Sequence, residues 1–194
     1  MKLYLVRHGE TEWNLLNRIQ GQSDIPLNEN GRNQARELAK AIQSSGLVFD
    51  RIYTSRMIRA KETAEIIAAD LQTKFSVLDG IEEMNLGKWE GYTWRQVREA
   101  FPEEYAIWHE NRRYQVPPEG ESYEQLLQRV LPVLKRVAGE GEGKALMVTH
   151  SAVIMTLLSF FYDKPFEDMA KNFKTKNTEI VELKEDIMEV LCTR

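Results

Sequence analysis

The chain has 194 residues, of which 42% are hydrophobic and 29% are charged, proportions typical of soluble globular proteins that exclude disordered, collagen-like and fibrous classes. Its 26 basic and 30 acidic residues give a net charge of -4, so the chain lacks the positive field with which proteins bind nucleic acid or an anionic membrane. We expect a single domain over residues 1–194, in which any anionic ligand must be held by a local group of residues.

Three features of the chain favour a cytoplasmic location. The apolar run at residues 3–6 is too short for the core of a signal peptide, so we expect it to belong to the fold. The mostly apolar stretch 152–162 falls short of the roughly 20 residues that cross a bilayer. The single cysteine, Cys192, permits no internal disulfide, which suits a reducing compartment.

Short, nearly continuous apolar runs predict strands of a parallel sheet that is buried on both faces. The clearest runs are residues 3–6 and 145–149, each of which ends at a polar cluster. The predicted strands, in chain order, are residues 3–6, 51–54, 75–78, 145–149, 178–183 and 187–191.

Apolar residues at helical spacing predict helices between these strands. Asn28 can cap the first helix and Gly46 can end it, while Ser55 opens the second. Ser122 with Gln125 forms a capping-box pattern ahead of the third. The predicted helices cover residues 28–46, 55–71, 122–137 and 152–161.

Strands that alternate with helices over the length of one domain predict an α/β protein, a three-layer α/β/α sandwich around a mostly parallel sheet. Residues 90–118 share no single sustained period and end at Pro117 and Pro118. We expect a helical insertion near residues 90–118 that could form a lid.

Two of the three histidines, His8 and His150, directly follow the two clearest strands. Ligands of open α/β sheets bind beyond the carboxyl ends of the strands, so the two imidazoles would meet in one pocket if these strands are neighbours. Arg7 and Gly9 flank His8, and arginine beside an unhindered backbone favours an anion. The residues alone leave open whether each histidine is functional or is simply hydrogen-bonded at the edge of the core.

Four motifs follow one another along the chain. They are Arg7-His8-Gly9-Glu10-Thr11 with Trp13-Asn14, Ser55 with Arg59-Ala60 and Thr63-Ala64, Glu83 ahead of Gly87 and Trp89-Glu90-Gly91, and Val148-Thr149-His150. Together they resemble the motifs of the histidine phosphatase superfamily, the phosphoglycerate-mutase-like proteins. Ser151 departs from this pattern, because the family usually has glycine after its second histidine.

The resemblance implies phosphoryl transfer that needs no metal and no other cofactor. His8 would be the nucleophile and would become a phosphohistidine. Arg7, Arg59 and His150 would hold the phosphoryl oxygens, where negative charge gathers in the transition state.

Glu83 would be the general acid and then the general base. Spacing and pattern do not separate Glu83 from Glu82, and only the family's interval to Gly87 selects Glu83. The substrate-binding residues expected from the resemblance are Gly9, Asn14, Gln20, Ser23, Ser151, Arg112 and Arg113.

The expected activity is hydrolysis of phosphomonoesters of the phosphoglycerate, sugar phosphate or α-ribazole phosphate type. Residues 117–122 lack the insertion of the longer glycolytic mutases, so water could enter the pocket. Two alternatives stay open: a phosphoglycerate mutase that uses 2,3-bisphosphoglycerate, and a non-catalytic binder of a phosphorylated ligand. The expected partner is a small phosphorylated molecule rather than nucleic acid or a membrane, and a homodimer stays open.

Overall fold

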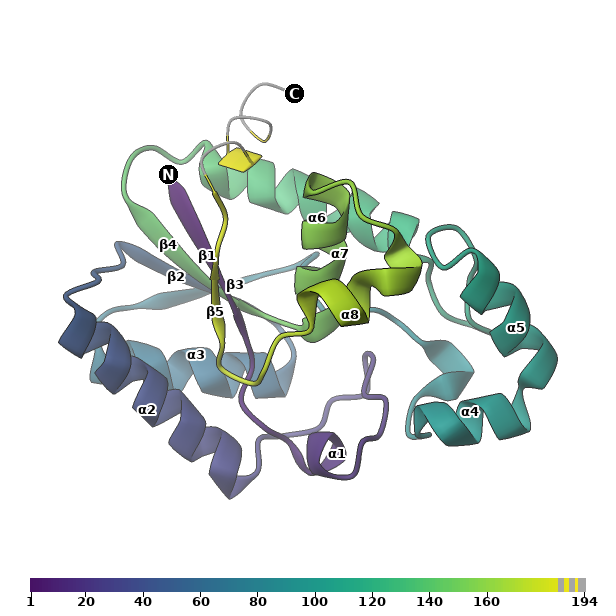
Figure 1. Cartoon of the computed structure of the whole chain (residues 1–194). Coiled ribbons are helices and arrows are strands. Elements are labelled where there is room, and N and C mark those ends of the chain that lie inside the picture. The colour runs from purple at the N-terminus through teal and green to yellow at the C-terminus, as the bar shows by residue number, and fades with distance from the viewer. Residues whose placement is uncertain (185–186, 189–190, 192–194) are drawn as a thin grey trace.

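A computed structural model describes residues 1–184, 187–188 and 191. Its strands are β1 Lys2–Arg7, β2 Arg51–Ser55, β3 Phe75–Leu78, β4 Lys144–Thr149 and β5 Ile180–Glu182. Among the described residues they form one five-stranded sheet in the order β3-β2-β4-β1-β5 (Figure 1). All neighbouring strands are parallel except β5, which runs antiparallel to β1. The expectation of a mostly parallel sheet is therefore confirmed.

The helices alternate with the strands much as the apolar spacing predicts. They are α1 Glu12–Leu15, α2 Glu29–Ser45, α3 Ile58–Asp70, α4 Trp94–Ala100, α5 Pro102–Glu110, α6 Tyr123–Ala138, α7 Ser151–Phe161 and α8 Met169–Phe173. Asn28 caps α2, and Gly46 ends it in the left-handed conformation with φ 71°. Ser122 and Gln125 form the capping box of α6. No helix among the described residues is both long enough and apolar enough to cross a bilayer.

Helices cover both faces of the sheet, with α2 and α3 on one face and α6 and α7 on the other (Figure 1). Leu3 and Leu5 of β1 belong to the same buried cluster as residues of α6 and α7. Tyr4 and Val6 point the other way and join residues of α2 and α3. A fully buried aliphatic side chain stabilises the fold by about 1.5–3 kcal/mol, which explains why both faces are covered. The predicted α/β/α sandwich is thus confirmed.

The register of β1 against β4 decides where the two histidines lie. Arg7 is paired with Thr149, and the His8 N–H donates to the Thr149 carbonyl at 3.0 Å. His8 and His150 therefore leave adjacent parallel strands at the same edge of the sheet, and their ring centroids lie 5.3 Å apart. The condition that the sequence left open, that these two strands are neighbours, is met.

Two expected element boundaries are wrong. Ser55 does not open a helix: it is the last residue of β2, and α3 begins at Ile58 with Met57 as its N-cap. The Ser55 hydroxyl instead bonds to His150 and accepts from the Met57 N–H.

The strand expected at residues 187–191 is not found, because Ile187, Met188 and Leu191 are helical and buried. The spacing of these three apolar residues is that of one helix face, which competes with the strand interpretation. Residues 189–190 of that prediction, and Cys192, lie outside the described residues.

The helical insertion expected near residues 90–118 consists of α4 and α5. Trp89 and Trp108 are fully buried, and their rings meet edge to face at 5.2 Å between centroids. Trp94 stacks on Trp108 at 5.4 Å. These aromatic contacts anchor the insertion to the residues that precede it, and pairs of this kind are worth about 0.5–1.5 kcal/mol beyond their buried area.

Trp108→Ala should lower the free energy of unfolding by about 3–5 kcal/mol, because it leaves a cavity in this aromatic cluster. Ile107→Ala is the matched control on the same helix, since Ile107 is 57% exposed and should change the free energy by about 0.5 kcal/mol or less. Urea unfolding measures both, and similar values for the two variants would contradict the anchoring role of Trp108.

Candidate active site

His8 stands at the carboxyl end of β1 in a state suited to nucleophilic attack. It is 2% exposed, and its Nδ1 lies 2.7 Å from the Gly9 carbonyl oxygen. A carbonyl oxygen only accepts hydrogen bonds, so Nδ1 carries the proton and Nε2 keeps its lone pair. Burial, followed by the positive charges of Arg59 and Arg7, holds the pKa of His8 well below its usual 6.5. The imidazole is therefore neutral at neutral pH.

The charges of two guanidinium groups act on this imidazole, those of the fully buried Arg59 and the half-buried Arg7. Nη1 and Nη2 of Arg59 donate to the carbonyl oxygens of Ser23 and Gly21 at 2.8 and 2.7 Å. Arg7 donates through Nη1 to the Thr175 carbonyl at 2.7 Å. In each arginine Nε is buried without a partner, and within the described part of the chain neither side chain forms an ion pair with a carboxylate.

His150 lies against His8 with one ring nitrogen free among the described residues. Its Nε2 is 2.8 Å from the Ser55 hydroxyl, whereas Nδ1 is buried and has no hydrogen-bond partner there. Burial, followed by the positive charge of Arg59 and smaller contributions from His8, Arg129 and Arg7, lowers the pKa of His150 well below 6.5. An anion between the histidines and the arginines would reverse this effect, because negative charge favours the protonated imidazole. The free nitrogen could then donate to that anion.

The structure places the adjacent carboxylates Glu82 and Glu83 in different surroundings. Glu82 is 3.1 Å from the Arg56 guanidinium and 3.6 Å from that of Arg129, so it belongs to an ion-pair cluster. Glu83 accepts hydrogen bonds from the Met84 N–H at 2.9 Å and from the Ala152 N–H at 3.2 Å. It makes no ion pair within the described part of the chain.

Burial raises the pKa of Glu83 above the usual 4.5, although the Met84 N–H, Arg59, the Ala152 N–H and Arg7 oppose the shift. A raised pKa makes a carboxyl group more readily protonated, which a general acid requires before it can give that proton away. Of the two neighbours, Glu83 has the environment of a general acid.

The loop that holds Arg59 is organised by a carboxylate to which the sequence analysis assigned no role, that of Glu90. Glu90 accepts from the N–H groups of Gln22, Ser23 and Leu86 at 2.8, 2.9 and 3.2 Å, and from the Ser23 hydroxyl at 2.6 Å. Gly21 sits in the same turn with φ 51°, where a Cβ would come within 2.0 Å of Glu90 Oε1. Glu90 and Ser55 both stand inside the sequence motifs, so the motifs themselves carried the signal for these supporting residues.

Gly9 is explained by close packing. A Cβ on Gly9 would lie 2.5 Å from the Gly31 carbonyl oxygen, which only glycine avoids. The Gly9 N–H donates to the Thr63 hydroxyl at 3.0 Å, and that hydroxyl donates to the Arg59 carbonyl at 2.7 Å. Thr63 is thus a further residue of the second motif that supports the site.

The remaining expected substrate-binding residues fall into separate groups. Asn14 and Ser151 line a cleft of about 470 Å³ that also contains Arg7. Gln20 is buried, and its Oε1 has no partner among the described residues. Ser23 contributes a carbonyl to Arg59 and a hydroxyl to Glu90.

Arg112 and Arg113 diverge. The Arg112 guanidinium lies 4.5 Å from the ring centroid of Trp108, and its charge acts on Tyr123, whose pKa burial raises to about 12. The Glu83 carboxylate acts on the same phenol, so Arg112 and Glu83 face a common side chain.

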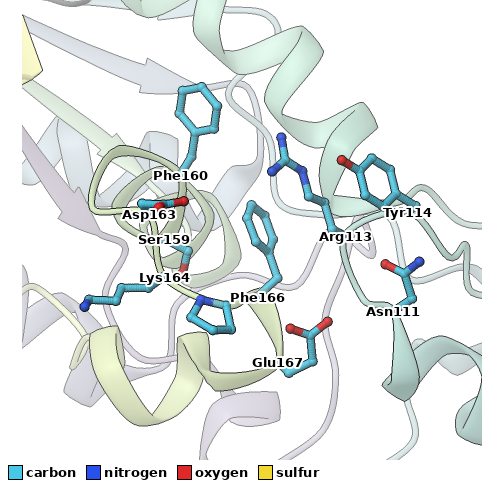
Figure 2. A pocket seen from close by; sticks show the side chains of 10 residues that line it. Asn111, Arg113, Tyr114, Ser159, Phe160, Asp163, Lys164, Phe166 and Glu167 are labelled. Carbon is cyan, nitrogen blue, oxygen red and sulfur yellow. The ribbon is translucent and has the colours of Figure 1, made fainter.

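Arg113 turns to a different pocket, of about 370 Å³, between the α5–α6 connection and the segment after α7 (Figure 2). It pairs with Glu124 at 2.8 Å and lies over the Phe166 ring. The structure therefore packs Arg112 against Trp108 and pairs Arg113 with Glu124, and it does not bring Arg113 to the histidines. Within the described ranges, no group of three or more His, Cys, Asp and Glu side chains is arranged to hold a metal ion.

The fold and the cluster of histidines and arginines are typical of proteins that bind phosphate groups. Comparisons with known proteins identify the family. The chain belongs to the histidine phosphatase superfamily (branch 1), whose family model matches residues 3–189. Bacillus stearothermophilus YhfR is similar in structure, with a TM-score of 0.84 and 33% identity, over 94% of this chain and 90% of that one. Phosphoserine phosphatase from Entamoeba histolytica, solved in complex with 3-phosphoglyceric acid, has a TM-score of 0.80 and 32% identity, over 93% and 89%.

Human 6-phosphofructo-2-kinase/fructose-2,6-bisphosphatase 3 is 35% identical over 167 residues, which are 86% of this chain and 31% of that protein. The chain thus spans about a third of the length of the curated relatives it matches. Membership of the superfamily, with phosphatases among the similar proteins, supports phosphatase activity for this fold.

Glu90→Gln should lower the free energy of unfolding by about 1–3 kcal/mol, because its amide would place N–H groups against N–H donors of the loop that holds Arg59. Glu99→Gln is the control, since Glu99 is 65% exposed on its side chain and should change stability by about 0.5 kcal/mol or less. Urea unfolding measures both variants, and an unchanged Glu90→Gln protein would show that the four hydrogen bonds do not organise the loop.

Proposed function

We propose that this protein is a metal-independent phosphomonoester hydrolase that acts on small phosphorylated metabolites through a phosphohistidine at His8. The observation that carries the proposal is a pair of guanidinium groups next to a neutral imidazole, that of the buried Arg59 and that of the half-buried Arg7, with no carboxylate partner among the described residues. Unpaired buried cations are costly, so a site of this kind is completed by an anion. A phosphate ester fits the charge and leaves Nε2 of His8 to attack it.

In the first step, Nε2 of His8 attacks phosphorus in line with the ester bond. The bond from phosphorus to the leaving oxygen breaks, and Glu83 donates its proton to that oxygen, so the alcohol leaves neutral. Arg7, Arg59 and the free nitrogen of His150 hold the phosphoryl oxygens while charge gathers on them.

In the second step, water replaces the alcohol. Glu83, now ionised, takes a proton from the water as its oxygen attacks phosphorus, and the bond between phosphorus and Nε2 breaks. Inorganic phosphate leaves, His8 returns to its neutral state, and Glu83 is again protonated.

The names of the similar proteins support a small phosphorylated metabolite as substrate, since they include a phosphoserine phosphatase and a fructose-2,6-bisphosphatase. A mutase would use the same phosphohistidine and would return the phosphoryl group to a phosphoglycerate instead of water. A binder without catalysis would have no use for the raised pKa of Glu83. We further propose that the protein acts in the cytoplasm, because a single cysteine, Cys192, suits a reducing compartment.

The first test is turnover of p-nitrophenyl phosphate and of 3-phosphoglycerate in the presence of a chelator, with both free phosphate and 2-phosphoglycerate measured. We expect phosphate release that His8→Ala reduces by about 10³-fold or more, because the variant lacks the nucleophile. Isomerisation that exceeds phosphate release would make the protein a mutase. Activity that a divalent metal restores after chelation would overturn the metal-independent mechanism.

The pH profile of kcat/KM tests the roles of His8 and Glu83. Activity needs neutral His8 and protonated Glu83, so the acid limb should lie below pH 6.5 and the alkaline limb above pH 4.5, in the directions of the two pKa shifts. Glu83→Gln should remove the alkaline limb and slow hydrolysis of an alkyl phosphate by about 10²–10⁴-fold. The loss should be smaller with p-nitrophenyl phosphate, whose leaving group needs no proton. An alkaline limb that survives in Glu83→Gln would assign it to another group.

A further inference from the structure

The cleft of about 470 Å³ beside the histidines contains two cations that the reaction does not use, Arg18 and Lys174. Arg7 and Ser151, the chain neighbours of His8 and His150, also line this cleft, which we name the outer cleft. Arg18 comes from the segment after α1 and Lys174 from the segment after α8. Two segments far apart in sequence therefore supply positive charge to the same space.

Neither cation is neutralised by a carboxylate within the described residues. Arg18 donates through Nη1 to the Gly91 carbonyl at 2.7 Å, which orients the guanidinium and leaves its charge unpaired. Lys174 makes no hydrogen bond or ion pair with any described residue. Glu10 is the acidic residue that lines the outer cleft, and its Oε1 already accepts from the amides of Asn28 and Asn30 at 2.9 and 3.1 Å.

The remaining lining limits the size and kind of ligand. Trp94 and Met155 provide apolar surface, and Asn14 and Asn177 provide amide groups. A volume of about 470 Å³ falls in the range of small-molecule sites, which run to roughly 300–1,000 Å³. A short carbon skeleton that carries a negative group matches this mixture better than a neutral sugar or a long apolar chain.

We propose that the outer cleft binds a second anionic group of the substrate, a carboxylate or a further phosphate, through Lys174 and Arg18. This inference rests on the proposed function, because it takes the scissile phosphate to lie between His8, Arg7 and Arg59. The second group then makes charge-assisted contacts at the far end of the cleft, and these contacts select doubly anionic substrates. These contacts contribute to substrate binding rather than to the chemical step. Substrates with and without the second anionic group should therefore differ in KM rather than in kcat.

Arg113 is the competing site for a second anion, and its surroundings argue against it. Its charge is paired with Glu124, and the pocket that it lines also contains Asp163 and Glu167 (Figure 2). These two acidic side chains outnumber Lys164, the other cation of that pocket, so a second negative group is disfavoured there. Arg113→Gln should therefore leave the preference among substrates unchanged.

The test compares 3-phosphoglycerate with glycerol 3-phosphate, which differ only in a carboxylate against a hydroxymethyl group. We expect the protein to prefer 3-phosphoglycerate in kcat/KM by about 10-fold or more at low salt, and this preference to fall as salt screens the charges. Lys174→Gln and Arg18→Gln should each raise KM for 3-phosphoglycerate by about 10-fold and leave both KM for glycerol 3-phosphate and kcat within about twofold. Lys171→Gln, an exposed lysine of α8 that does not line the outer cleft, is the matched control.

Equal kcat/KM for the two substrates, or equal rises in KM for both in the variants, would overturn the inference while leaving the hydrolase intact. A preference lost in Arg113→Gln but kept in Lys174→Gln would also overturn it, in favour of the pocket of Figure 2. Calorimetric binding of both compounds to His8→Ala reports on the outer cleft without turnover. Preferential binding of 3-phosphoglycerate without any hydrolysis in the parent protein would reject the proposed function and retain the outer cleft as an anion site.

Discussion

The parallel pairing of β1 with β4 is the contact on which the site depends. It places the ends of both strands at one edge, so that His8 and His150 lie 5.3 Å apart although 141 residues separate them in the chain. Helices cover both faces of the sheet, which leaves this edge as the place where polar side chains can converge. The burial that stabilises the strands also removes water from the imidazoles, and this lowers the pKa of each of them.

Buried positive charge is the second constraint, and the fold satisfies it with neutral oxygens. Arg59 is held by the carbonyls of Gly21 and Ser23, and Arg7 by that of Thr175. Carbonyl groups orient a guanidinium without cancelling its charge, so the site keeps its attraction for an anion. The Glu90 carboxylate does not contact Arg59 directly. It accepts hydrogen bonds from the N–H groups of the loop whose carbonyls hold Arg59, and so fixes the geometry of that loop. This arrangement gives electrostatic preorganisation of the kind that stabilises a phosphoryl transition state.

The contrast between Glu82 and Glu83 shows how environment assigns roles to identical side chains. Glu82 forms ion pairs with Arg56 and Arg129 and belongs to a structural cluster. Arg59, Arg7 and two N–H groups favour the charged form of Glu83, yet burial outweighs them and raises its pKa. Arg112 and Arg113 diverge in the same way, one toward Tyr123 and the other into an ion pair with Glu124. In both pairs, adjacent residues of one type have different partners.

The sequence by itself determined the alternation of strands and helices, the caps at Asn28 and Ser122, and the order of the four motifs. These features are local, because apolar period and capping chemistry act within a few residues. It misplaced the start of α3, where the Ser55 hydroxyl bonds to His150 instead of capping a helix, and the element at 187–191, where apolar spacing allowed two interpretations. Only the tertiary structure decided which strands are neighbours. It also decided that the Thr63 hydroxyl accepts a hydrogen bond from the Gly9 N–H, and that Arg18 and Lys174 line one cleft. Such contacts join residues far apart in the chain, and their geometry depends on how the layers pack rather than on any local pattern.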